Sequence, residues 1–232
     1  MKRLWAIMPA AGAGRRLGGD TPKQYREVAG APLMEHTLRA LLQSRDICGV
    51  VVAIDSADRR ADTIASLSHE RVQTTLGGVT RAHSVLAGLD ALKEQVAEGD
   101  WALVHDAARP CLTVDALAAL IDRARVLGEG VILAEPVADT LKQVNGQGEI
   151  EKTVDRSILW RAQTPQLFPL QPLRDALRHC IEGGVSVTDE AMAMERAGQP
   201  VHVVEGASSN IKVTVEADLV FADMFLRAAE DR

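Results

Sequence analysis

Short apolar runs alternate with amphipathic stretches along most of the 232-residue chain. Short runs bounded by glycine predict strands, and apolar residues spaced three and four apart predict helices. In the stretch 81–96, Val85, Leu89 and Leu92 share one face. We expect strands at 4–8, 49–54, 101–105, 130–133 and 201–204 and one ending at residue 76, with helices at 33–42, 81–96, 114–127, 173–181, 189–197 and 216–229.

Strands separated by helices indicate right-handed βαβ crossovers. The expected fold is therefore one α/β domain, 1–232, with a mostly parallel Rossmann-like sheet flanked by helices. Ligands of such sheets bind at the carboxyl ends of strands. The residues that follow Met8, Leu76, His105 and Leu133 are the first place to look for a site.

Residues 137–160 interrupt this alternation. Two β-compatible runs, 140–144 and 149–154, flank an Asn-Gly pair, which is a strong hairpin signal. The hairpin has few large apolar residues, and an isolated hairpin is marginal in water. We expect a protruding hairpin arm that packs on something else.

Composition narrows the function classes. A net charge of −6 and a pI near 5.5 disfavour a nucleic-acid binder, so basic clusters should serve small anions. Cys48, Cys111 and Cys180 are few and widely spaced, which predicts reduced thiols and a cytoplasmic protein. The sequence contains no signal peptide and no apolar run of about 18 residues, so no membrane association is expected.

The first chemical motif is PAAGAGRR at 9–16. It is not a dinucleotide fingerprint, because Leu17 stands where Gly or Ala is needed, and it lacks the Lys-Ser/Thr of a P-loop. Small residues after a strand let backbone N–H groups approach a phosphate. With Arg15, Arg16 and Lys23 nearby, the motif predicts a polyphosphate site. A tight turn with solvated arginines is the alternative.

Two further motifs follow predicted strands. GGVTRAHS, at 77–84, suits backbone contacts to a planar base, but taken by itself the motif is better explained as a loop followed by an N-cap. In HDAARP, at 105–110, Asp106 could accept from hydroxyls while Arg109 binds an anion. A local ion pair is the alternative there. We favour a ligand, because strand ends carry the sites of this fold.

Three motifs near the C-terminal half have simple structural explanations when taken singly. KTVDRSILWRAQTPQ, at 152–166, reads as a solvated hairpin strand followed by a turn. VTDEA, at 187–191, reads as a helix N-cap. NIKVT, at 210–214, reads as a surface lysine, Lys212, whose stem packs on apolar neighbours.

Together, in this order and over nearly the whole chain, these motifs resemble the 2-C-methyl-D-erythritol 4-phosphate cytidylyltransferases of isoprenoid precursor synthesis. The resemblance rests on PAAGAGRR, PKQY, GGVTR, HDAARP, the KTVDRSILWRAQTPQ block, VTDEA and NIKVT. It implies transfer of CMP from CTP to 2-C-methyl-D-erythritol 4-phosphate, with release of pyrophosphate.

The attacking phosphate of such an acceptor is largely dianionic at neutral pH, so no general base is required. Cations and a divalent metal must stabilise the charge. The six histidines lack metal-ligand spacing, and Mg²⁺ binds mainly through substrate phosphates. We therefore expect Mg²⁺ without protein ligands.

The resemblance also implies roles for individual residues and a homodimer whose hairpin arms embrace, with Arg156 serving the partner's site. The residues at the transition state are Arg16, Lys23 and Lys212. Those that bind the nucleotide are Pro9, Ala10, Ala11, Gly12, Gly14, Gly77, Gly78, Arg81 and Ser84. Those that bind the polyol phosphate are Asp106, Arg109, Thr140, Arg156, Thr164 and Thr188.

Three alternatives stay open. A cytidylyltransferase for ribitol 5-phosphate would share much of the motif set. A nucleotide-sugar pyrophosphorylase would share the sheet and the early loop but would usually be longer. A nucleotide-sensing module without enzymatic activity would not need Arg16, Lys23 and Lys212 to converge on one phosphate.

Overall fold

The computed structural model describes residues 1–12 and 21–230. Within these ranges, seven strands form one central sheet, in which β10 runs antiparallel to both neighbours and the other pairs are parallel. The mostly parallel sheet predicted from the sequence is confirmed. In spatial order the strands are β11 (Val201–Glu205), β7 (Gly130–Pro136), β10 (Trp160–Pro169), β6 (Trp101–Val104), β1 (Leu4–Pro9), β4 (Ile47–Ile54) and β5 (Val72–Leu76).

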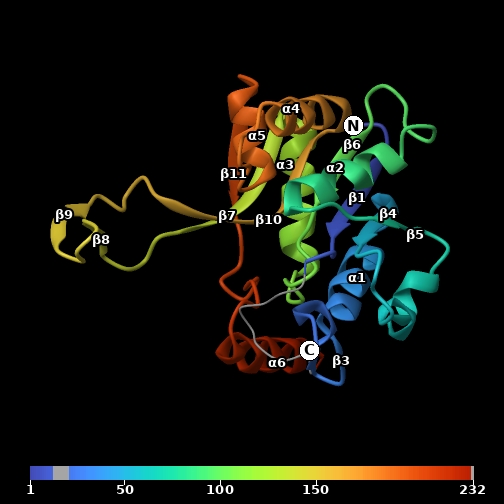
Figure 1. Ribbon diagram of the computed structural model, residues 1–232, viewed down its shortest axis with the longest axis horizontal. Helices are drawn as coiled ribbons and strands as arrows, with labels where there is room; N and C mark the ends of the chain where they lie inside the picture. The colour runs from blue at the N-terminus through green and yellow to red at the C-terminus, as the bar shows by residue number, and fades with distance from the viewer. Residues whose placement is uncertain (13–20, 231–232) are drawn as a thin grey trace.

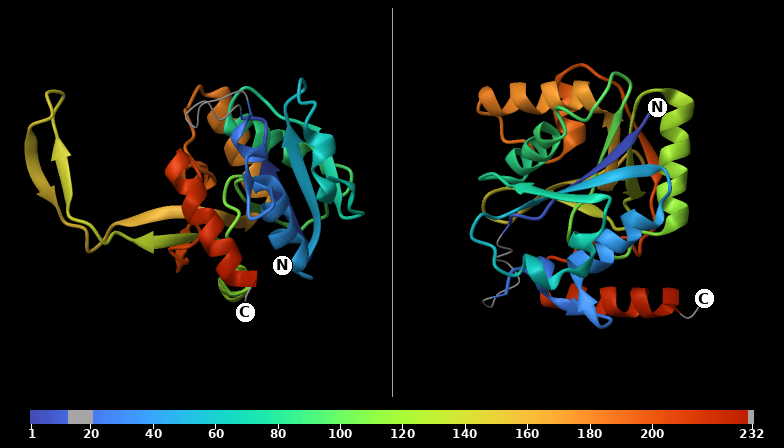
Figure 2. Two further views of the ribbon diagram at one scale, coloured as in Figure 1. Left: turned by 90° about the horizontal axis from the view of Figure 1, so that it is seen from below. Right: turned by 90° about the vertical axis from the view of Figure 1, so that its right-hand side faces the viewer.

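Helices cover both faces of the sheet (Figures 1 and 2). Alternate strand residues point to opposite faces, as Val50 and Val51 of β4 do, so each face contributes to its own aliphatic core. One face carries α1 (Leu33–Gln43) and α3 (Val114–Leu127), and the other carries α2 (Arg81–Ala91), α4 (Leu170–Glu182) and α5 (Glu190–Arg196).

The C-terminal helix packs beside a small accessory sheet at one end of the molecule (Figure 1). This end is formed by α6 (Glu216–Glu230), β2 (Glu27–Val28) and β3 (Ala31–Pro32). Short 3-10 helices connect the remaining elements: η2 (Lys23–Tyr25), η3 (Ala61–Thr63) and η4 (Ala65–Ser68). No helix in the described ranges is long and apolar enough to cross a membrane.

The predicted helices are all present, but α2 ends at Ala91 rather than at residue 96. Tertiary contacts divert the chain there. The Asp100 carboxylate accepts from the Ala97 N–H at 3.0 Å, and Arg3 donates to the Gln95 carbonyl at 2.7 Å. These bonds replace the ones that a longer helix would make.

Strand β10 was not predicted, since its segment was interpreted as a turn. The pattern is misleading because buried positions of this central strand are polar. Gln163 and Thr164 are 5% and 4% exposed, and Gln166 is 1% exposed. The pairing with β7 is irregular between Ala162 and Gln166, where Pro165 lacks an N–H to donate.

The expected hairpin is present as β8 (Leu141–Val144) paired with β9 (Ile150–Val154). It extends well away from the sheet as an arm (Figures 1 and 2). The side chain of Asn145 accepts from two backbone N–H groups of the turn, and Gly148 supplies a φ of +84°. Large apolar side chains of the arm remain exposed in the single chain: Val144, Ile150, Ile158 and Trp160.

Candidate active site

A cavity of about 460 Å³ opens at the carboxyl ends of β1, β4, β5 and β6. This is the edge that the strand order predicted. Its lining residues come from the end of β1, from the loops after these strands, from η2, from the first turn of α2 and from the segment before α6: Pro9, Ala10, Ala11, Gly12, Lys23, Gln24, Asp55, Gly78, Val79, Thr80, Arg81, Ser84, Asp106, Ala107, Ala108 and Lys212.

The loop after β1 contributes small residues to the cavity wall. The Ala10 N–H donates to the Ala53 carbonyl at 2.8 Å, and the buried Gln24 amide donates to the Ala10 carbonyl at 2.7 Å. Gln24 therefore fixes both this loop and the short helix that carries Lys23. Arg16 and Gly14, which the resemblance placed at the phosphates, lie outside the described residues.

The loop after β5 forms the facing wall. The Ser84 hydroxyl accepts from the Gly78 N–H at 3.1 Å, and the Thr80 side chain accepts from the His83 N–H at the start of α2. The predicted N-cap is therefore present, and its loop also lines the cavity. Gly77 does not line the cavity directly but packs behind it, beside Ser84.

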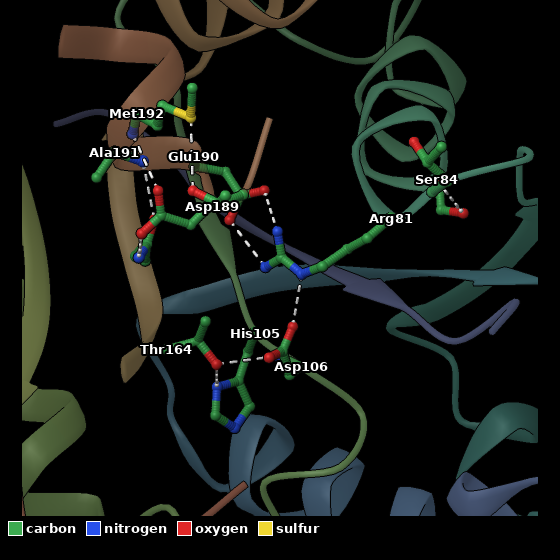
Figure 3. Close-up of polar contacts among 12 residues, drawn as sticks. Arg81, Ser84, His105, Asp106, Thr164, Asp189, Glu190, Ala191 and Met192 are labelled. Carbon is green, nitrogen blue, oxygen red and sulfur yellow. Dashed lines mark hydrogen bonds and ion pairs between the residues drawn. The ribbon is translucent and has the colours of Figure 1, made fainter. Parts of the chain in front are cut away.

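A chain of ion pairs connects the lining residues Asp106 and Arg81 to the buried Glu190 (Figure 3). The Asp106 carboxylate accepts from Arg81 Nε at 2.8 Å and from Lys212 Nζ at 2.7 Å. The other end of the Arg81 guanidinium donates to both oxygens of Glu190, at 2.7 and 2.9 Å. Glu190 and Asp106 thus hold Arg81 between them, and Asp106 holds Lys212.

The ionisation of this cluster follows from burial and charge together. Burial alone would raise the pKa of Asp106, but Arg81 and Lys212 outweigh it and hold that pKa well below its usual range. Burial would lower the pKa of Arg81, yet Glu190 and Asp106 raise it above its ordinary value. Burial raises the pKa of Glu190, although Arg81 opposes that rise. Asp106 and Arg81 therefore remain charged near neutral pH.

Arg109 and Thr164 lie behind the cavity rather than in its wall. Arg109 is 8% exposed and donates to the Asn210 carbonyl at 2.6 Å, while its Nε stays 3.9 Å from Asp106 Oδ2. The Thr164 hydroxyl accepts from the Asp106 N–H at 3.1 Å and contacts His105 Nδ1 at 3.0 Å (Figure 3). In this single chain both residues support the loop after β6.

The other residues predicted to bind the polyol phosphate do not line the cavity of their own chain. Thr140 and Arg156 are exposed and flank the hairpin of the arm, one before β8 and one after β9. Thr188 is exposed ahead of α5 and donates to Met192 Sδ at 3.5 Å. Asp189, not Thr188, caps α5 by accepting from the Met192 N–H at 3.0 Å.

Glu190, Gln24 and Asp55 are among the residues of this site that were not singled out from the sequence. Glu190 was present in the VTDEA motif but was hidden by the N-cap interpretation. Gln24 was present in PKQY. Asp55 directly follows β4, so the rule about strand ends could have identified it.

The family model for 2-C-methyl-D-erythritol 4-phosphate cytidylyltransferase matches residues 4–228. The chain belongs to this family. It is similar to the cytidylyltransferase of Aeromonas hydrophila, with 49% identity over 99% of this chain and 92% of that protein. It is similar to that of Vibrio vulnificus, with 45% identity over 100% of this chain and 98% of that protein.

Solved structures of the cytidylyltransferase family share the fold. The crystal structure of the Francisella tularensis 2-C-methyl-D-erythritol 4-phosphate cytidylyltransferase superimposes with a TM-score of 0.84 at 33% identity. The match covers 97% of this chain and 100% of the other. The similarity therefore extends over nearly the whole chain.

Proposed function

We propose that this protein transfers the cytidylyl group of CTP to 2-C-methyl-D-erythritol 4-phosphate and releases pyrophosphate, as a step of non-mevalonate isoprenoid precursor synthesis. One structural observation supports the proposal in addition to family membership. Lys23, Lys212 and the small-residue loop after β1 meet at one cavity, opposite the loop 77–80. Two lysines beside backbone that can approach phosphates make a site for a nucleoside triphosphate.

The proposed reaction requires stabilisation of negative charge and does not require a general base. The acceptor phosphate is largely dianionic at neutral pH, since its second pKa is about 6. Its oxygen attacks the α-phosphorus of CTP, the bond to the β-phosphate breaks, and pyrophosphate leaves. His105 is a poor candidate for a base, because burial lowers its pKa to about 4 and both ring nitrogens already bind Thr164 and Arg109.

The nucleotide occupies the cavity between the two loops. Its triphosphate lies along Ala10–Gly12 and Lys23, and its base faces the loop that begins at Gly78. Ser84 orders this second loop through the Gly78 N–H, which supports a role in base selection. Arg16 and Gly14 join the phosphate side in this proposal.

The acceptor is bound between Asp106 of one chain and the arm of a second chain. Thr140 and Arg156 flank the hairpin and do not line the cavity of their own chain, and the arm leaves Ile150 and Ile158 exposed. These observations support a homodimer in which each arm completes the partner's site. Arg109, Thr164 and Thr188 support the acceptor side more remotely.

Mg²⁺ belongs to this proposal as a companion of CTP, whose phosphate charge it neutralises when bound. The donor set of the cavity fits that arrangement. Asp106 has both oxygens in ion pairs, and the described residues include no cluster of three potential metal ligands. The phosphates of CTP, together with water, would therefore supply most of the ligands of Mg²⁺.

Placement in the cytoplasm is also part of the proposal. All three cysteines are free thiols, and Cys111 and Cys180 are buried. Free, widely separated thiols are typical of reducing compartments.

An acceptor panel tests the function. Purified protein with CTP and Mg²⁺ should release pyrophosphate only when 2-C-methyl-D-erythritol 4-phosphate is added. Release with ribitol 5-phosphate at equal or higher efficiency would reassign the acceptor. Release with a sugar 1-phosphate would favour a nucleotide-sugar pyrophosphorylase, and no release with any acceptor would favour a sensing module.

A further inference from the structure

Glu190 is a buried carboxylate that the proposed chemistry does not use. It is the first residue of α5, directly after the capping Asp189, and its relative exposure is 0%. A carboxylate is rarely buried to this extent without a partner. Its partner is Arg81, which donates to the two Glu190 oxygens at 2.7 and 2.9 Å (Figure 3).

The contacts continue from Glu190 to the cavity without a gap. Arg81 donates its remaining nitrogen, Nε, to Asp106 Oδ1 at 2.8 Å. The second oxygen of Asp106, Oδ2, binds Lys212 Nζ at 2.7 Å. Lys212 is 35% exposed in its side chain and lines the cavity, so the chain of contacts connects a fully buried carboxylate to an accessible cation.

The geometry of the guanidinium explains why Glu190 matters for Lys212. A guanidinium is a planar fork with N–H groups on two edges, and it can bind one carboxylate with two parallel bonds. Glu190 accepts an N–H from each of the two Nη atoms, and in this orientation Asp106 Oδ1 accepts from Nε. Without the charge of Glu190, Arg81 could turn its fork to Asp106 and take the oxygen that now holds Lys212.

We propose that Glu190 is a positioning residue, which holds Arg81 in the orientation that lets Asp106 keep Lys212 at the cavity. The inference rests on the proposed function, in which Lys212 stabilises charge on the phosphate under attack. Within the part of the chain that the structure describes, one carboxylate, that of Asp106, pairs with Lys212. Small displacements of a catalytic group reduce turnover strongly.

The test compares Glu190→Gln with the wild type in the full-length protein, using pyrophosphate release from CTP and 2-C-methyl-D-erythritol 4-phosphate. Glutamine keeps the shape of the side chain but removes its charge. We expect kcat to fall roughly 10- to 100-fold, with a KM for CTP within about threefold of the wild-type value. The matched control is Glu195→Gln, which removes the same charge from an exposed position of α5 and should leave kcat unchanged.

A second comparison separates positioning from a loss of folded structure. In a Lys212→Ala background, adding Glu190→Gln should cost little more, because the group through which Glu190 acts is already gone. If the fold-reduction of kcat in the double variant equals the product of the fold-reductions in the two single variants, the inference is overturned. An unchanged kcat in Glu190→Gln alone would overturn it as well. A wild-type protein that releases no pyrophosphate would instead overturn the proposed function.

If Glu190→Gln does not fold, the pair Arg81→Met/Glu190→Met replaces the ion pair by apolar side chains, a change that proteins often tolerate. We expect kcat to fall in this variant as well. Adding Lys212→Ala to it should again reduce kcat by less than the product of the two separate effects. Wild-type kcat in this pair would overturn it.

Discussion

Gly77 packs against both the loop after β1 and the start of α2. A Cβ atom at this position would lie 2.4 Å from Ala11 Cβ and 3.0 Å from Ser84 Oγ. The next glycine has a similar reason to be there, since a Cβ on Gly78 would lie 2.4 Å from His83 Cβ. The pair therefore serves the packing of the loops, in addition to the base contact inferred from the sequence.

Gly77→Ala should push the loop after β1 away from Ser84 and weaken CTP use. We expect the KM for CTP to rise roughly tenfold or more, which corresponds to about 1.4 kcal/mol. The control is Gly146→Ala at the tip of the arm, where a Cβ meets nothing within 4 Å. Equal CTP kinetics for the two variants, both folded by circular dichroism, would contradict this account of the loops.

His105 connects the site to the stability of the protein. Its pKa is lowered by burial from 6.5 to about 4, so the folded state binds its proton at lower pH than the unfolded chain does. Between these two values the unfolded state holds more protons, and the free energy of unfolding must fall as the pH falls. The full contribution is on the order of 3 kcal/mol.

The prediction is a difference between two pH profiles. Urea unfolding from pH 7 to pH 4 should show a steeper loss of stability for the wild type than for His105→Gln, whose side chain does not titrate. Parallel curves over this range would mean that His105 does not stay neutral when folded.

At the scale of elements, periodicity predicted α3 at its observed bounds and missed β10. Helix α3 is a surface helix, whose apolar stripe faces one core and whose Gly128 ends it at φ +68°. Strand β10 buries amides whose partners lie far along the chain: Gln166 binds Asp189 and the Ala191 N–H, and Asn210 binds Gln163. Such partners cannot be read from local pattern.

The site residues that could be predicted from the sequence are likewise those whose positions depend on local pattern. Motifs after strands located Lys23, Asp106 and the loop at Gly78 because parallel strand ends share one edge. Glu190 could not be placed in that way, since its role depends on a contact with Arg81 across 109 positions of sequence.

A substitution at Phe168 tests whether β10 is a buried central strand of the sheet. It is fully buried, and its ring packs so closely that a Cβ on Gly130 would lie 2.5 Å from it. Phe168→Ala should lower the free energy of unfolding by about 3–5 kcal/mol. Phe221→Ala, on the exposed side of α6 at 53% exposure, should change it by less than about 1 kcal/mol. Similar urea midpoints for both variants would contradict the structure of this strand.

The whole molecule consists of a compact α/β body and one arm that reaches away from it (Figure 1). The arm has no core of its own, and Thr140 and Arg156 flank its hairpin. Apolar side chains that are exposed on such an arm are expected to be covered by another protein surface. In the proposed homodimer, that surface and the acceptor site belong to the second chain.

Mixed dimers test whether Arg156 acts in the partner. Arg156→Ala and Asp106→Ala should each be nearly inactive alone. If Arg156 acts across the dimer, a mixed dimer holds one site with both changes and one with neither. After subunit exchange, each mixed dimer should therefore regain the activity of one site, about half that of a wild-type dimer. No recovery, with exchange confirmed by mass spectrometry, would leave the arm without a part in catalysis.

The most direct measurement follows the phosphorus atoms themselves. ³¹P NMR of the wild-type protein with CTP, Mg²⁺ and 2-C-methyl-D-erythritol 4-phosphate should show the acceptor's phosphomonoester signal disappear. Pyrophosphate and a diphosphate diester should appear in equal amounts, because the acceptor oxygen bonds to the α-phosphorus as pyrophosphate leaves. Conversion of CTP to CMP and pyrophosphate with the acceptor signal unchanged would contradict cytidylyl transfer to this acceptor.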